Sequence, residues 1–188
     1  MFRKLCSAIL GLFLGSGNAV AGQGSAWDYT FTSIDGTPMP LQSYAGRVVL
    51  VVNTASRCGF TPQYEGLEKI WNTYKDRGKG LVVIGVPSND FGEQEPGSNP
   101  EIKTFCETTF NVSFPLTERN VVSGDNAHPF YQWAAQQTGA AGIPRWNFHK
   151  YLIGPDGRLL DWFLPTTKPD DPKITGAIEM ALDNADRN

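Results

Sequence analysis

Two nearly continuous apolar runs dominate the hydrophobic pattern of the chain, "RVVLVVNTA" at 47–55 and "GLVVIGVP" at 80–87. Both runs are rich in β-branched residues, and neither alternates regularly with polar positions. Runs of this kind are typical of strands that are covered on both faces of a sheet. The pattern therefore predicts two buried strands.

Apolar residues with helical spacing follow the first of these strands. The segment "PQYEGLEKIWNTYKDR" at 62–77 predicts an amphipathic helix, with Thr61 as its N-cap and Pro62 as its first residue. Its apolar face is formed by Leu67, Ile70, Trp71 and Tyr74. Cys58 is therefore expected in a turn between a buried strand and a helix N-terminus.

Three further helices are predicted from shorter signals. A short helix over about 100–109 has Asn99 as its expected cap, and a second covers 128–137, with His128 as the expected cap. A third helix closes the chain over 170–184, and the acidic residues at its start suit a helix N-terminus.

Two hairpins complete the pattern, with turns at Asp35-Gly36 and at Asp156-Gly157. Strands that alternate with helices and then end in a hairpin indicate an α/β fold with a central mixed sheet flanked by helices. No repeat or linker interrupts the pattern, so we predict a single domain over 22–188.

The first residues have the layout of a secretory signal peptide. Two basic residues precede an apolar run, and "AVA" at 19–21 is a small-x-small cleavage pattern, which predicts a signal peptide over 1–21. The alternative is a membrane anchor, but the apolar run is shorter than the roughly 20 residues that span a bilayer. Cys6 lies too close to the basic residues to suit lipidation. The sequence thus predicts an exported protein, most simply a periplasmic one.

Cleavage changes the charge balance that a partner would meet. Loss of Arg3 and Lys4 leaves 14 of the 16 basic residues against 19 acidic ones, a net charge of about −5. An acidic chain without a basic cluster offers little to a phosphate backbone, so nucleic acid is not expected as a partner. No membrane association is expected after cleavage.

Two cysteines remain after cleavage, Cys58 and Cys106. In an oxidising compartment such a pair is read first as a structural disulfide. A buried, inert Cys58 is a second interpretation. The third is a reactive thiol, because the N–H groups at a helix N-terminus favour a thiolate, and Arg57 and Gly59 supply a positive neighbour and a tight turn.

The chemistry of such a thiol depends on its partners. Hydrolysis would require a histidine base, and neither His128 nor His149 is recognisable as one from its local sequence. No Cys/His spacing resembles a zinc site. Attack on a peroxide needs no strong base but does need neutral hydrogen-bond donors, and Gln94, Trp146 and Asn147 are of this kind.

Three motifs give the chain a specific resemblance. "NTASRCGFTPQYEGLE" around Cys58, "NDFGEQEPGSNPEI" and "WNFHKYLIGPDG" are similar, in this order, to the three signatures of the glutathione peroxidase family in its cysteine-containing form. The likeness extends over about 28–167. It implies a thioredoxin-like fold and a thiol peroxidase that reduces hydrogen peroxide and organic hydroperoxides, with neither metal nor cofactor.

The resemblance also assigns roles to residues. Cys58 falls on the peroxidatic position, and Gln94, Trp146 and Asn147 fall on the other members of the catalytic tetrad. Cys106 matches the resolving cysteine of the thioredoxin-dependent branch. The chain departs from the family before the second signature, where "PSND" has Ser88 in place of a frequent cysteine and Asp90 in place of the usual glutamine.

The remaining implications concern the reductant. The segment 128–146 lacks the insertion that builds tetramers in glutathione-using animal enzymes, which implies a monomer that uses a thioredoxin-like dithiol protein rather than glutathione. The helix that carries Cys106 is rich in threonine, a poor helix former, so we expect it to open and deliver Cys106 to an oxidised Cys58. A thiol–disulfide oxidoreductase and a non-catalytic module with a structural disulfide are the alternatives.

Overall fold

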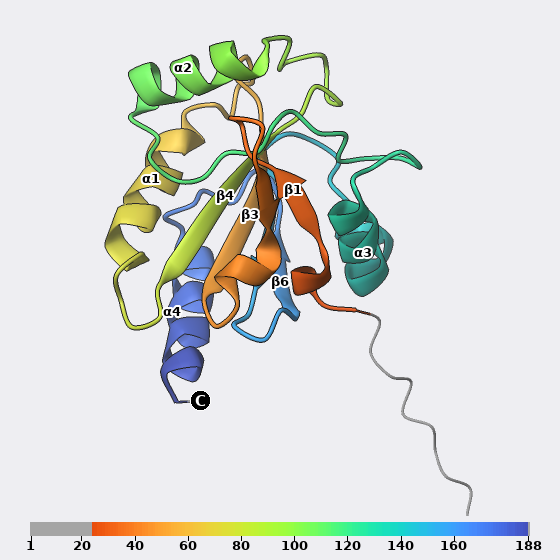
Figure 1. Cartoon of the computed structure of the whole chain (residues 1–188). Coiled ribbons are helices and arrows are strands. Elements are labelled where there is room, and N and C mark those ends of the chain that lie inside the picture. The colour runs from red at the N-terminus through yellow and green to blue at the C-terminus, as the bar shows by residue number, and fades with distance from the viewer. Residues whose placement is uncertain (1–23, 188) are drawn as a thin grey trace, which may run out of the picture.

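The structure, a computed structural model, describes residues 24–187 (Figure 1). The predicted signal peptide and its cleavage site lie outside the described residues. A four-stranded mixed sheet forms the centre of the domain, in the order β4-β3-β5-β6. Its strands are β3 (Val48–Thr54), β4 (Leu81–Pro87), β5 (Lys150–Ile153) and β6 (Leu159–Phe163).

Strands β3 and β4 run parallel, whereas β5 is antiparallel to both β3 and β6. Every residue of β3 and β4 is buried, which confirms the interpretation of the two apolar runs. The carboxyl ends of β3 and β4 and the start of β5 therefore lie at the same edge of the sheet. The register of Val52 with Lys150 fixes this arrangement.

Four helices surround the sheet in the part of the chain that the structure describes (Figure 1). They are α1 (Gln63–Tyr74), α2 (Asn99–Phe110), α3 (Pro129–Thr138) and α4 (Pro172–Asp186). Short 3-10 helices occur at Ala26–Asp28, Leu41–Tyr44 and Gly139–Ala141, and a small hairpin joins β1 (Thr30–Thr32) to β2 (Pro38–Pro40).

The alternating residues of the central strands supply two hydrophobic clusters, one on each face of the sheet. Val48, Leu50 and Val52 pack with residues of α1, α2 and α4. Val49 and Val51 pack on the other face with α3 and the β1–β2 hairpin. The predicted α/β domain with a mixed sheet flanked by helices is thus confirmed. No helix among residues 24–187 is long and apolar enough to cross a membrane.

The local predictions of helix starts have different outcomes. The prediction that His128 caps α3 is confirmed, because its ring nitrogen accepts the N–H of Phe130. The prediction of Asn99 as the cap of α2 is wrong by one residue. Ser98 is the cap, and it forms a reciprocal capping box with Glu101.

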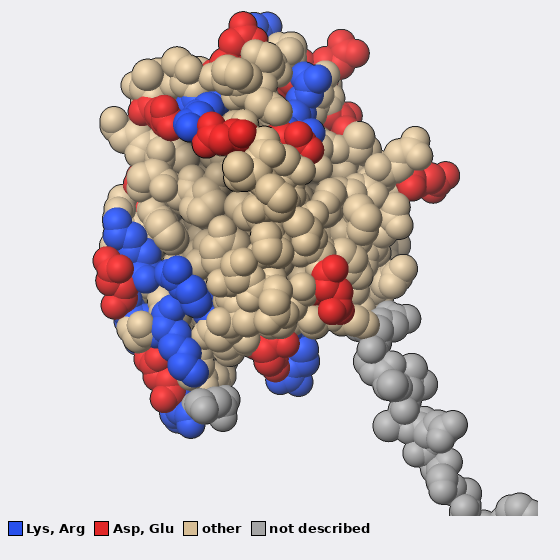
Figure 2. Space-filling model, in the orientation of Figure 1, with Lys and Arg blue, Asp and Glu red and all other residues tan. Residues whose placement is uncertain are grey.

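Acidic and basic side chains lie next to one another on the face shown in Figure 2, mainly over α2 and over α1 and α4. The centre of this face carries few charges. Several of the neighbouring charges are ion pairs, such as Arg77 with Asp183 at 2.8 Å and Lys103 with Asp35 at 2.8 Å. Because these pairs are exposed, each contributes little to stability.

Candidate active site

Cys58 lies in the turn between β3 and α1, as predicted. Its Sγ accepts the N–H of Phe60 at 3.3 Å, and its own N–H donates to the Thr61 hydroxyl oxygen at 3.0 Å. The Thr61 hydroxyl in turn donates to the carbonyl of Ala55 at 2.8 Å. Cys58 is 7% exposed and thus largely buried, with its sulfur held in a hydrogen-bonded turn.

The bonds of Thr61 correct one prediction. Thr61 was expected to cap α1 with its side chain, but α1 begins at Gln63, and Pro62 precedes it without a side-chain cap. The Thr61 hydroxyl is instead used within the Cys58 turn. It therefore fixes the backbone on both sides of the thiol.

Two of the expected donors are in direct contact. The side-chain amide of Asn147 donates to Oε1 of Gln94 at 2.9 Å, and the carbonyl of Gln94 accepts the N–H of Arg57 at 3.0 Å. Asn147 is fully buried, and its Oδ1 has no partner among residues 24–187. Since Arg57 precedes Cys58, these bonds bring the amide pair to the cysteine turn.

Trp146 completes the set of expected donors. It packs on Phe91 with ring centroids 6.2 Å apart, and it remains 40% exposed. Gly92 lies beside both the Gln94 side chain and the Trp146 ring, and its φ of 65° is in the left-handed region that favours glycine. The structure thus brings together the segments of all four expected residues at one edge of the sheet.

Glu95 is a buried carboxyl group that the sequence did not reveal as part of this region. Its Oε1 accepts the hydroxyl of Ser56 at 2.5 Å, while its Oε2 has no partner in the described part of the chain. Burial raises the pKa of Glu95, and the Ser56 bonds and the charges of Arg119 and Arg57 oppose that rise. The Ser56 bond is a second tie between the Gln94 segment and the cysteine turn.

Asp90, whose role was left open by the sequence, has a structural explanation. Its Oδ2 accepts three hydrogen bonds, from the N–H of Val122 at 2.7 Å, the N–H of Ser123 at 3.0 Å and the Ser123 hydroxyl at 3.2 Å. Asp90 therefore anchors the 120–123 segment beside the loop that carries Gln94.

Cys106 lies on the inner face of α2 and is completely buried. Burial raises the pKa of its thiol from 9.0 to about 11, while the nearby Tyr64 hydroxyl lowers it. That hydroxyl is close enough to interact but does not form a well-aligned hydrogen bond. Both described cysteines are free thiols, so the disulfide expected for a purely structural pair is not formed in this state.

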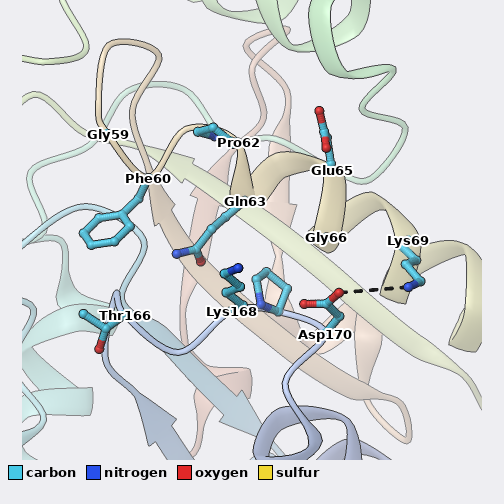
Figure 3. Close-up of a pocket in the computed structure, with 11 residues that line it drawn as sticks. Gly59, Phe60, Pro62, Gln63, Glu65, Gly66, Lys69, Thr166, Lys168 and Asp170 are labelled. Atoms are coloured by element: carbon cyan, nitrogen blue, oxygen red, sulfur yellow. Dashed lines mark ion pairs between the residues drawn. The ribbon is translucent and has the colours of Figure 1, made fainter.

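A cleft of about 440 Å³ opens next to the cysteine turn (Figure 3). One wall comes from the turn and from α1, the other from the loop between β6 and α4. Phe60 supplies an aromatic surface, and an ion pair of 4.0 Å joins Lys69 and Asp170 across the cleft. Gln63 ties the walls together through a 2.6 Å bond to the carbonyl of Pro165.

Both histidines of the chain make packing or capping contacts. His128 caps α3 and stacks on Phe31 at 4.1 Å. His149 is buried and stacks on Trp162 at 5.7 Å, and burial together with the Lys150 charge lowers its pKa to about 4. Among residues 24–187, no group of three or more His, Cys, Asp or Glu side chains is arranged to hold a metal ion.

The known proteins that the chain resembles in sequence belong to one family. The family described as "Glutathione peroxidase" matches residues 26–135. The chain is 49% identical over 153 residues to the hydroperoxy fatty acid reductase Gpx2 of Synechocystis sp., a match that covers 81% of this chain and 96% of that protein. It is 41% identical over 171 residues to the thioredoxin/glutathione peroxidase BtuE of Escherichia coli, covering 79% and 92%.

Solved structures show the same fold. The crystal structure of Trgpx in apo form aligns with a TM-score of 0.69 and 36% identity, over 86% of this chain and 97% of that chain. A thiol:disulfide interchange protein of the thioredoxin family from Chlorobium tepidum aligns with a TM-score of 0.61 and 17% identity, over 82% and 92%. This second likeness shows the fold alone, which is thioredoxin-like, as expected.

Proposed function

Since the chain belongs to the glutathione peroxidase family and is a thiol peroxidase, we propose that Cys58 is the residue that attacks the peroxide. The Cys58 thiolate attacks one oxygen of the O–O bond, and the bond breaks. A sulfenic acid forms on Cys58, and the other oxygen leaves as water or an alcohol after it takes up a proton. Sulfur is oxidised and the peroxide is reduced.

The hydrogen-bonded pair of Gln94 and Asn147 supports this assignment most directly. The backbone carbonyl of Gln94 accepts the N–H of Arg57 next to the cysteine turn, and the two bonded side-chain amides are neutral. Neutral donors stabilise the thiolate and the developing charge on the leaving oxygen without the repulsion that a carboxylate would add. Trp146, at the surface of the same region, adds an indole N–H.

Regeneration of the thiol is assigned to Cys106. In this step the sulfur of Cys106 attacks the sulfenic sulfur of Cys58, an S–S bond forms and water leaves. A dithiol then reduces the disulfide through a mixed disulfide. A thioredoxin-like protein is the proposed dithiol, with glutathione as the alternative reductant, and the Escherichia coli relative is named for both. We assign the active form as a monomer.

The proposed substrates are hydrogen peroxide and organic hydroperoxides. The cleft beside Phe60 provides room for an organic group next to the cysteine turn. The Synechocystis relative is named for hydroperoxides of fatty acids, which have such a group. The alternative function is thiol–disulfide exchange, which the thioredoxin-like fold also permits.

Export is proposed from the N-terminal sequence. The basic residues, the apolar run and the "AVA" pattern at 19–21 support cleavage after Ala21 and release into the periplasm. Expression of the full chain in a Gram-negative host, followed by the intact mass of the periplasmic protein, tests this. A mass that begins at Gly22 is expected, and an uncleaved membrane-bound chain would contradict the assignment.

The catalytic proposal is tested by treating the reduced protein with one equivalent of peroxide and following its mass over seconds. The parent protein should lose two hydrogens, Cys106→Ser should gain one oxygen, and Cys58→Ser should do neither. If peroxide persists while the parent protein stays unchanged, Cys58 does not perform this reaction. Exchange with a dithiol in the absence of peroxide turnover would favour the alternative function.

A further inference from the structure

The turn that carries Trp146 and Asn147 has an unfavourable backbone conformation. Phe148, which follows them, has a φ of 65°, in the left-handed region that bulky residues avoid. Such a conformation is strained and persists only where neighbouring groups impose it. The groups that hold Phe148 therefore also set the direction of the Asn147 amide.

One side of this turn is held by Asn53 at the end of β3. The side-chain amide of Asn53 donates to the carbonyl of Trp146 at 3.0 Å, and the Asn53 carbonyl accepts the N–H of Phe148 at 2.6 Å. These two bonds fix the turn against the sheet. Neither bond involves the carbonyl of Phe148, which has a different partner.

Lys150 holds that carbonyl. Its Nζ donates to the Phe148 carbonyl at 2.8 Å and to the Thr167 carbonyl at 2.9 Å. Thr167 follows Thr166, which lines the cleft beside the cysteine turn. One ammonium group thus joins the catalytic turn to the opposite cleft wall.

The position of this ammonium group is costly. Lys150 is fully buried, and burial lowers its pKa to about 7. Among residues 24–187, Lys150 forms no ion pair with a carboxylate, and its partners are the two carbonyls. An apolar side chain of the same length would fill the space without the cost of burying a charge. What the lysine adds is a pair of directed, charge-assisted bonds.

The surroundings of Lys150 contain few competing charges. The adjacent residue His149 is titratable, and the Lys150 charge contributes to lowering its pKa to about 4. His149 is therefore neutral above pH 5. The pKa of Lys150 itself has burial as its cause, with no contribution from a charged group of β3, β6, the 164–171 loop or α4 among residues 24–187.

We propose that Lys150 is a positioning residue of the peroxidase reaction. It holds the turn at 146–148 against the 164–171 loop, and this arrangement directs Asn147 and Gln94 toward Cys58. This inference rests on the proposed function. Lys150 touches neither the peroxide nor the sulfur in this scheme. Without its bonds Phe148 relaxes toward ordinary φ values, and the Asn147–Gln94 pair loses its orientation.

The test compares two reactions of the same sulfur in the Cys106→Ser protein. One is oxidation of Cys58 by hydrogen peroxide, which depends on the oriented donors. The other is alkylation of Cys58 by iodoacetamide, which needs the thiolate but not the donors. Both are followed at the Cys58 peptide by mass spectrometry after rapid quenching, and the ratio of the two rate constants removes changes in the thiolate fraction.

Lys150→Met should lower this ratio about ten- to a hundred-fold at pH 6, because small misplacements of catalytic groups have effects of that size. Lys79→Met, an exposed lysine remote from the site, is the matched control and should leave the ratio unchanged. A folded Lys150→Met protein with the parental ratio would overturn the inference.

A second measurement needs no substitution at Lys150. In the Cys106→Ser protein the ratio should fall several-fold between pH 6 and pH 9, with a midpoint near pH 7, as the ammonium group loses its proton and its bonds weaken. A ratio that stays flat over this range also overturns the inference. If Cys58 does not react with peroxide at any pH, it is the proposed function that fails.

Discussion

A more stable α2 should slow the second step of the reaction without affecting the first. Cys106 is completely buried on the inner face of α2, so its sulfur becomes available only when the helix opens. Thr104 and Thr109 are exposed positions of this helix, and each Thr→Ala change stabilises a helix by about 0.5 kcal/mol. Together they favour the closed state by about 1 kcal/mol, which lowers the open fraction about five-fold.

Rapid-quench mass spectrometry measures both steps. In Thr104→Ala/Thr109→Ala the Cys58–Cys106 disulfide should form about five times more slowly, while sulfenic acid should form at the parental rate. Ser98→Ala removes the capping box and costs the helix about 1 kcal/mol, so it should speed disulfide formation about five-fold. Thr73→Ala, the same change in α1, is the control.

The two α2 variants are expected to change the rate of disulfide formation in opposite directions. If disulfide formation has the same rate in the parent, in the stabilised helix and in the uncapped helix, opening of α2 does not control the approach of Cys106. The reasoning would also fail if sulfenic acid formation slowed in parallel, since the first step does not involve α2.

Three other predictions follow from single groups. Gln94→Ala should slow oxidation of Cys58 by hydrogen peroxide about a hundred-fold, in stopped-flow measurements, because it removes one donor to the developing charge. Asp90→Ala should lower the free energy of unfolding in urea by about 1 kcal/mol, because it leaves the N–H groups of Val122 and Ser123 without their acceptor. For Lys150, the proton is bound in both states below pH 7 but only in the unfolded state between about 7 and 10.5. The free energy of unfolding relative to Lys150→Met should therefore rise with pH in that window, by at most about 1.4 kcal/mol per pH unit in urea titrations.

The fold could be predicted largely from the sequence because its strongest signals are local. Fully buried strands appear in the sequence as continuous runs of β-branched residues, and the Asp156-Gly157 turn predicts the last hairpin. Helix caps were harder, since Ser98 and Asn99 are both good capping residues. The glutamate three residues after Ser98 was the signal that distinguishes them.

The supporting residues of the site could not be predicted in the same way. Successive side chains of a strand point to opposite faces of the sheet. If only one face were buried, either the lysine or the adjacent histidine would be exposed to solvent. Lys150, the first residue of β5, and His149, which precedes the strand, are both buried, because this part of the sheet is covered on both faces. The bonds of Lys150 reach Thr167, 17 positions away, so no local pattern records them. The proposed catalytic residues were identified through sequence motifs, whereas the residues that support them depend on tertiary contacts.

The position of Cys106 links the two steps in a definite order. In the closed helix its thiol has a pKa of about 11 and no exposed surface, so at neutral pH it is neither ionised nor reachable. Opening of α2 exposes the thiol to water and returns its pKa toward the ordinary value of 9.0, which raises the thiolate fraction about a hundred-fold. One motion thus supplies both access and nucleophilicity. In the proposed mechanism Cys58 reacts first, because it is 7% exposed in the closed state whereas Cys106 is completely buried, and Cys106 becomes available only when α2 opens.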